Sequence, residues 1–281
     1  MGKFSDALEK SEKEQGNSQI KGEKFNVFDT LKVVTGDHEK PPVPVIRKTQ
    51  KKLAPGLVTV SQPHSFEAEQ FRNLKTNILF SSERGAPRII MVTSAVPDEG
   101  KSFVSANLAV TFAQSVDEHV LLIDCDLRLP TIHRVFGLSD DAPGLSDLLS
   151  GTVEVPDVLY KTDVEKLTIL PGGRIPDNPT ELLSSKRMKN LLMEVESRYK
   201  DRYIIIDSPP PLLTAETMAI SRQVDGILIV VKHEGTSRNE VKEMIDQLDK
   251  DKILGVIVNR YDVRLAKYYG YGKYGTYYGK K

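Results

Sequence analysis

The sequence predicts an α/β protein in which a doubly wound, mostly parallel sheet is flanked by helices. Short apolar runs of strand length recur from residues 88–93 to residues 253–258. Segments with the apolar periodicity of helices separate these runs. The runs are continuous rather than alternating, which is typical of strands that are buried on both faces, as parallel strands are.

The predicted elements alternate in order along the chain. Strands are predicted at residues 88–93, 119–123, 167–170, 203–206, 226–231 and 253–258. Helices are predicted over about 15 residues from Phe66, and at residues 101–115, 131–136, 145–149, 179–199, 214–221 and 237–248. Pro179 opens the longest of these helices, at a position where its missing N–H costs no hydrogen bond.

Three regions are expected along the chain. Residues 1–65 lack clear periodicity and contain a proline cluster, so we expect a poorly ordered leader or a docking segment for a partner. Residues 66–260 form the folded domain. Residues 261–281 hold seven of the ten tyrosines among glycines and lysines, which predicts a flexible, tyrosine-rich tail.

Composition limits the classes of function that remain open. The single cysteine, Cys125, excludes an internal disulfide framework and fits a small core residue in a reducing compartment. Lys plus Arg equals Asp plus Glu at 39 each, so no net field favours nucleic acid. No apolar stretch approaches the roughly 20 residues of a membrane span. We therefore expect a cytoplasmic protein that reaches a membrane only through a partner.

One segment carries the signature of a phosphate-binding loop. Ala95-Val96-Pro97-Asp98-Glu99-Gly100-Lys101-Ser102 follows a predicted strand and opens a predicted helix, as this motif requires. Its backbone N–H groups and the helix dipole would attract a triphosphate. Lys101 would neutralise the phosphates, and the Ser102 hydroxyl would bind Mg²⁺. The expected nucleotide contacts are Ala95, Pro97, Asp98, Glu99, Gly100, Lys101, Ser102 and Phe103. This predicts a P-loop NTPase fold that binds ATP and Mg²⁺.

Carboxylates follow two further predicted strands. Asp124 and Asp126 end one apolar run, and Asp207 ends another, as in a Walker B motif. Ligands of open parallel sheets bind beyond the carboxyl ends of the strands, so these side chains should meet the loop there. We predict Asp126 and Asp207, with Ser102, as the metal site; in isolation each aspartate could equally be a helix cap. Asn259 and Arg260 follow the last strand, where they could contact the adenine.

Several motifs together resemble the bacterial tyrosine autokinases, or BY-kinases, of capsule and exopolysaccharide systems. Residues 124–130, with the sequence DCDLRLP, resemble that family's second Walker motif. Further similar segments are residues 144–151, 170–173, 178–183 and 204–211, and the terminal tyrosines resemble the family's autophosphorylated cluster. The resemblance covers about residues 66–281.

The resemblance implies transfer of the ATP γ-phosphate to tyrosine, chiefly on the tail of a neighbouring subunit. Asp124 would be the base or polariser of the hydroxyl, Lys101 would bind phosphate, Asp126 and Asp207 would organise Mg²⁺, and Arg128 would contact phosphate or substrate. The implied phosphoacceptors are Tyr268, Tyr269, Tyr271, Tyr274, Tyr277 and Tyr278.

The resemblance also implies partners. Glu69, Arg72 and Lys75 stand where the family carries an E-x-x-R-x-x-R helix for ring-like self-assembly; lysine in the last position lacks the bidentate geometry of arginine. The chain resembles the split arrangement, in which a separate membrane protein activates the kinase. A cognate tyrosine phosphatase is the other implied partner, and the regulated process would be polysaccharide polymerisation or export.

Two other functions stay open at this point. A Min- or Par-type partition ATPase would share the fold, but it carries a second lysine where this chain has Val96. A nucleotide-binding scaffold without catalysis would not need the intact set of charged residues. The tail alone could also bind nucleic acid through stacking and charge.

Overall fold

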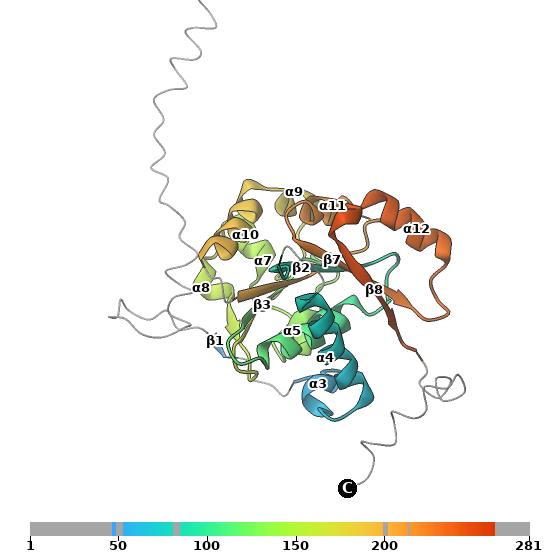
Figure 1. Ribbon diagram of the computed structural model, residues 1–281. Coiled ribbons are helices and arrows are strands. Elements are labelled where there is room, and N and C mark those ends of the chain that lie inside the picture. Colours follow the sequence, from blue (N-terminus) through green and yellow to red (C-terminus); the bar gives the residue numbers. More distant parts are fainter. Residues whose placement is uncertain (1–46, 49–52, 81–84, 199–201, 213, 262–281) are drawn as a thin grey trace, which may run out of the picture.

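The computed structural model describes residues 47–48, 53–80, 85–198, 202–212 and 214–261. Its centre is an eight-stranded sheet in the order β1-β4-β5-β3-β6-β2-β7-β8 (Figure 1). Neighbouring strands run parallel except β4 and β5, which are antiparallel. The strands are β1 Arg47–Lys48, β2 Ile89–Ser94, β3 His119–Asp124, β4 Tyr160–Lys161, β5 Leu167–Leu170, β6 Arg202–Asp207, β7 Gly226–Lys232 and β8 Ile253–Asn259.

Helices cover both faces of this sheet, as expected (Figure 1). On one face lie α3 Val58–Ser61, α4 Phe66–Leu79, α5 Lys101–Ala113 and α6 Ile132–Val135. On the other lie α7 Leu145–Ser150, α8 Val155–Val158, α9 Pro179–Leu183, α10 Lys186–Arg198, α11 Ala215–Ser221 and α12 Arg238–Gln247. A 3₁₀ turn, η1 Lys250–Lys252, precedes β8. Each face has its own apolar core, because alternate side chains of each strand point to opposite faces.

The central strands confirm the prediction to within one or two residues. β2 and β6 are buried at every position, which explains why their sequences are continuous apolar runs. The short strand β4 was not predicted. Its two residues pair antiparallel with β5, and so short a run carries no periodicity that could reveal it.

The single long helix expected at residues 179–199 was wrong. The structure has two helices, α9 and α10, with a break at Ser184 and Ser185. The Ser184 hydroxyl donates to the Thr180 carbonyl at 2.7 Å, and the Ser185 hydroxyl accepts from the Met188 N–H at 3.2 Å. Serine competes in this way for backbone groups, so it ends one helix and caps the next.

The folded region begins upstream of the expected boundary at residue 66. Leu57 is fully buried, and the Asn107 side chain on α5 accepts hydrogen bonds from the N–H and hydroxyl of Thr59. The Asn107 amide also donates to the Gly56 carbonyl at 3.0 Å. Residues 53–65 are therefore part of the domain. The rest of the predicted leader, apart from β1, lies outside the described residues.

Candidate functional site

The phosphate loop connects β2 to α5, as the sequence predicted. Asp98 has φ of 62° and Gly100 has φ of 92°, so the backbone turns through the left-handed region at two nearby positions. A Cβ on Gly100 would lie 2.1 Å from Asn259 Nδ2, so a larger residue would have to displace the Asn259 side chain as well as adopt an unfavourable backbone conformation. Lys101 begins the helix and is buried.

Three strands bring the expected carboxylates to the edge of the sheet next to this loop. Asp207 of β6 is in register with Asp124 of β3 on one side and with Val92 of β2 on the other. Asp126 follows two residues after Asp124. The structure therefore brings the carboxylates that the sequence predicted for catalysis together at one edge of the sheet.

Asp124 is fully buried and held by backbone donors. Its Oδ1 accepts from the Asp126 N–H at 3.1 Å, and its Oδ2 accepts from the N–H groups of Thr131 and Ile132 at 2.9 and 3.0 Å. Burial, followed by the charge of Asp207, raises the pKa of the Asp124 carboxyl well above its usual range. The raised pKa makes this carboxylate a stronger proton acceptor.

Asp207 is also fully buried, and burial raises its pKa to about 6. Hydrogen bonds from Ser102 and Ser105 oppose this shift, as does the charge of Lys101. The Ser105 hydroxyl donates to Oδ1 at 3.1 Å. The second oxygen, Oδ2, is buried and has no hydrogen-bond partner among the described residues.

Asp126 is the more accessible of the site's aspartates, with 9% of its surface exposed. Its Oδ1 accepts from the Leu129 N–H at 3.2 Å. Burial raises the pKa of its carboxyl, whereas the charge of Lys101 and backbone N–H donors oppose the rise. The positive charge of Lys101 therefore opposes the raised pKa of both Asp126 and Asp207, and the site has three carboxyl groups beside one ammonium group.

The site fits Mg²⁺ bound in the way typical of phosphate loops. The unpaired Oδ2 of Asp207 is a hard oxygen donor, and the Ser102 hydroxyl is close enough to hydrogen-bond that aspartate. No cluster of three His, Cys, Asp or Glu side chains suited to a metal occurs among the residues that the structure describes. Mg²⁺ usually takes only one or two protein carboxylates and completes its shell with water and phosphate.

Arg128 does not project freely into the site. Its Nε donates to Glu216 Oε1 at 2.9 Å, and Glu216 is only 1% exposed. The Glu216 charge also raises the pKa of Asp126, which shows that this fourth carboxylate belongs to the same cluster. Sequence reasoning missed Glu216 because it stands in the first turn of a helix, where glutamate is common for a local reason.

The side chain of Glu99 lies on the side of the loop that faces the protein, so only its backbone N–H could be the nucleotide contact that the sequence predicted. Its side chain is fully buried and accepts from the Val96 and Lys232 N–H groups at 3.0 and 3.1 Å. The Thr236 hydroxyl donates to the same carboxylate. The Asn259 amide, expected at the adenine, donates to the Glu99 carbonyl at 2.8 Å. The side chains of Glu99 and Asn259 therefore hold the phosphate loop against the ends of β7 and β8.

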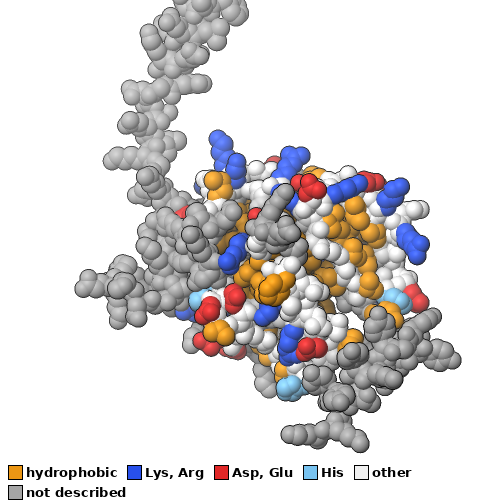
Figure 2. All heavy atoms as spheres, in the orientation of Figure 1, with side chains coloured by type: hydrophobic (Ala, Val, Ile, Leu, Met, Phe, Trp, Pro, Cys, Tyr) orange, Lys and Arg blue, Asp and Glu red, His pale blue; other side chains and the backbone are white. Residues whose placement is uncertain are grey.

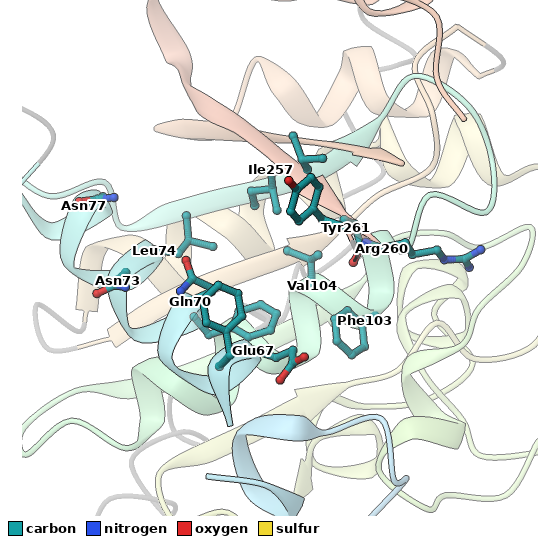
Figure 3. A pocket seen from close by; sticks show the side chains of 14 residues that line it. Glu67, Gln70, Asn73, Leu74, Asn77, Phe103, Val104, Ile257, Arg260 and Tyr261 are labelled. Atoms are coloured by element: carbon teal, nitrogen blue, oxygen red, sulfur yellow. Dashed lines mark hydrogen bonds between the residues drawn. The ribbon is translucent and has the colours of Figure 1, made fainter. Parts of the chain in front are cut away.

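A pocket of about 500 Å³ lies between α4, the start of α5 and the end of β8 (Figure 3). Three of the expected nucleotide contacts, Phe103, Asn259 and Arg260, line it. Arg260 points away from its centre, and its guanidinium lies 3.6 Å from the Asp98 carboxylate. Tyr261 lies at the rim with its ring edge-on to His233.

The predicted self-assembly residues lie on α4, but they do not form a uniformly free face. Arg72 pairs with Glu69 at 2.6 Å on the same helix and also donates to the Pro63 carbonyl. Lys75 instead donates to the Ser115 hydroxyl at 2.8 Å, and burial lowers the pKa of its ammonium group. The six predicted phosphoacceptor tyrosines, Tyr268 to Tyr278, lie outside the described residues.

Comparisons with known proteins show the family to which the chain is similar. The AAA domain family matches residues 88–254. Tyrosine-protein kinase YwqD of Bacillus subtilis (strain 168) is 37% identical over 234 residues, covering 82% of this chain and 96% of that protein. The putative tyrosine-protein kinase CapB of Staphylococcus aureus is 34% identical, covering 80% of this chain and 99% of that protein. The chain spans 34% of tyrosine-protein kinase wzc of Salmonella typhimurium, at 30% identity.

Solved structures give the same result. The crystal structure of the chimerical protein CapA2B2 has a TM-score of 0.69 and 34% identity, covering 78% of this chain and 94% of that chain. The septum site-determining protein MinD from Pyrococcus horikoshii OT3, complexed with Mg-ADP, has a TM-score of 0.51 and 28% identity, covering 62% and 70%. No helix in the described part of the chain has the length and apolarity to cross a membrane.

The fold is therefore that of a P-loop NTPase, which implies nucleotide binding. The relatives that match nearly their whole length are tyrosine kinases. The chain belongs to the family of bacterial tyrosine-protein kinases.

Proposed function

We propose that the chain is an ATP- and Mg²⁺-dependent tyrosine autokinase that phosphorylates its own C-terminal tyrosine cluster, between subunits. The observation that carries this proposal is the convergence of Asp124, Asp126 and Asp207 beside Lys101. Such a site can bind a triphosphate and accept a proton within one buried cluster.

Binding and positioning of the triphosphate fall to the phosphate loop. Backbone N–H groups at the start of α5 and the Lys101 ammonium group would hold the phosphate oxygens. Ser102, Asp126 and Asp207 would hold Mg²⁺, which neutralises charge on the phosphates. The pocket bordered by Phe103 and Arg260 is open beside this loop, and we assign it to the adenosine end of the nucleotide.

Asp124 is the proton acceptor in this proposal. The tyrosine oxygen bonds to the γ-phosphorus, the bond to the ADP oxygen breaks, and the phenolic proton moves to Asp124. Its raised pKa brings the carboxylate closer to the pKa of a phenol, which favours this transfer. Oδ1 carries one backbone hydrogen bond among the described residues, so it can accept another from the hydroxyl.

An activator and a second subunit complete the proposal. The sheet edge at β8 exposes Val256 and Val258 about half, and hydrophobic side chains are visible over this strand (Figure 2). A membrane-bound activator of a capsule or exopolysaccharide system would dock here, and a cognate phosphatase would reverse the modification.

Mixing two variants tests transfer between subunits. One is Lys101→Met, which keeps its tail tyrosines; the other is active but carries phenylalanine at all six predicted phosphoacceptors. We expect mass spectrometry to find phosphotyrosine on the Lys101→Met tail only when the active variant, Mg-ATP and an activator fragment are present. Asp124→Asn in the active partner should abolish this signal.

A partition-type ATPase is the second candidate, and the similarity to MinD supports it. ATP hydrolysis without phosphotyrosine, even with the activator fragment, would favour that function and contradict the autokinase.

A further inference from the structure

The phosphate loop contains a buried carboxylate, that of Glu99. It is fully buried, immediately before Gly100 of the phosphate loop. A buried negative charge repels an incoming triphosphate and is costly to remove from water. A neutral side chain would avoid both effects, so the carboxylate should provide something that a neutral group cannot.

Two acceptor oxygens that hold three donors are what this carboxylate provides. Oε2 accepts from the Val96 N–H at 3.0 Å, which closes residues 96–99 into a turn. Oε1 accepts from the Lys232 N–H at 3.1 Å and from the Thr236 hydroxyl. Lys232 ends β7, and Thr236 lies in the segment that leads to α12.

These contacts fix the loop at a point where its backbone is strained. Asp98, next to Glu99, has φ of 62°, a conformation that residues other than glycine adopt rarely. The direction of the loop N–H groups depends on this backbone. Without the contacts to β7, residues 96–99 would have to be ordered by the nucleotide itself, and that ordering would weaken binding.

We propose that Glu99 and Thr236 form a clasp that positions the phosphate loop before nucleotide binds. In this role Glu99 is a positioning residue: it acts through the loop backbone and through the end of β7. The proposal concerns the affinity for nucleotide, so it does not depend on which group receives the γ-phosphate.

Substitutions of Thr236 test the clasp most cleanly. Thr236→Val removes the hydroxyl at nearly constant shape, and Thr236→Ser retains it. We expect Thr236→Val in the full chain to raise the Kd for Mg-ADP about tenfold, measured by calorimetry, because the buried Oε1 of Glu99 loses one of its two donors. Thr236→Ser should stay within about twofold of the unmodified chain, since the donor is kept.

A matched control separates positioning from general stability. Thr162 is a half-buried threonine between β4 and β5 whose hydroxyl also donates to backbone carbonyls. Thr162→Val should lower the melting temperature about as much as Thr236→Val while leaving the Kd unchanged. Equal weakening of binding by both variants, or normal binding by Thr236→Val, would overturn the proposal.

Glu99→Gln completes the test. An amide can replace one acceptor oxygen but places N–H against a donor at the other, so binding should weaken at least as much as in Thr236→Val. The variant with both Glu99→Gln and Thr236→Val should bind no more weakly than Glu99→Gln alone, because the two changes break the same clasp. Autophosphorylation of Thr236→Val at saturating ATP should keep its rate while KM rises. Tighter binding by Glu99→Gln would show that repulsion of the phosphates dominates, and additive losses would show two independent contacts; either result overturns the clasp.

Discussion

Asp124 and Asp207 stand opposite each other in register on the neighbouring strands β3 and β6, and both are fully buried. Desolvation is the largest cause of the raised pKa of each carboxyl, and the charge of Asp207 adds to the shift of Asp124. The fold therefore buries two neighbouring carboxyl groups where their charged forms are disfavoured.

This relationship predicts a dependence of stability on pH. Asp207 has a folded-state pKa of about 6 against an ordinary value of 3.8, so between these values the folded state binds more protons than the unfolded state. Its contribution to the free energy of unfolding is complete below about pH 4 and is lost as pH rises through 6, by up to about 3 kcal/mol. Asp207→Asn should thus stabilise the metal-free protein more at pH 7.5 than at pH 5 in urea unfolding. The exposed Asp251→Asn is the control, and an equal effect of Asp207→Asn at both pH values would contradict the assignment.

Lys101→Met should abolish autophosphorylation while the protein stays folded. Lys101 is buried at the first position of α5, and a methionine of similar length can fill its space without its charge. Loss of phosphotyrosine by mass spectrometry, with little change in the thermal unfolding curve, is the expected result. Lys189→Met on the exposed surface of α10 should keep full activity. Phosphorylation of the Lys101→Met tail in the absence of any other kinase would refute catalysis at this site.

The ion pair of Arg128 with Glu216 should matter more than a surface ion pair. Arg128→Ala leaves the buried Glu216 carboxylate without its donor, so we expect a loss of about 1–2 kcal/mol, reduced because Arg128 itself is half exposed. Adding Glu216→Gln should recover part of the loss. Arg134→Ala breaks the exposed pair with Asp140 and should cost clearly less than Arg128→Ala in the same urea unfolding measurement, because water screens exposed charges. Equal losses in Arg128→Ala and Arg134→Ala would contradict this prediction.

The segment before α4 should be required for full stability. A chain that begins at Leu53 should unfold almost like the full chain, because it loses only the two-residue strand β1 and keeps buried Leu57 and the contacts of Thr59 with Asn107. A chain that begins at Ser65 should lose about 2–4 kcal/mol, the cost of exposing one large apolar side chain and breaking buried hydrogen bonds. Identical unfolding midpoints for the two shortened chains would return the domain boundary to residue 66.

Much of the sheet could be predicted, because a strand that is buried on both faces has a continuous run of apolar residues in its own sequence. The strands that end at Asp124 and Asp207 are continuous apolar runs, and the rule that ligands bind beyond the carboxyl ends of parallel strands brings their carboxylates together. The phosphate loop was recognised from eight consecutive residues in the correct strand and helix context. These features are local in sequence, so the residues alone are sufficient to reveal them.

The features that could not be predicted depend on partners distant in sequence. The hydrogen bonds of the Glu99 carboxylate could not be predicted, because its donor Thr236 is 137 residues away. Arg128 was expected at phosphate, but its partner Glu216 is 88 residues away. Thr59 was assigned to the poorly ordered leader, because the sequence does not show that its partner Asn107, on another element, binds it. A single sequence shows which groups could pair and not which ones do.

The side-chain amide of Asn259, the last residue of β8, donates to the carbonyl of Glu99 and lies next to Gly100. This contact has a consequence for synthesis of the chain, which proceeds from the N-terminus. The nucleotide loop is translated early but receives its final brace only when residue 259 has left the ribosome, near the end of the chain. The tyrosines at positions 268–278, which we propose as phosphoacceptors, follow almost at once. A nascent chain would therefore complete the support of its phosphate loop shortly before these tyrosines emerge.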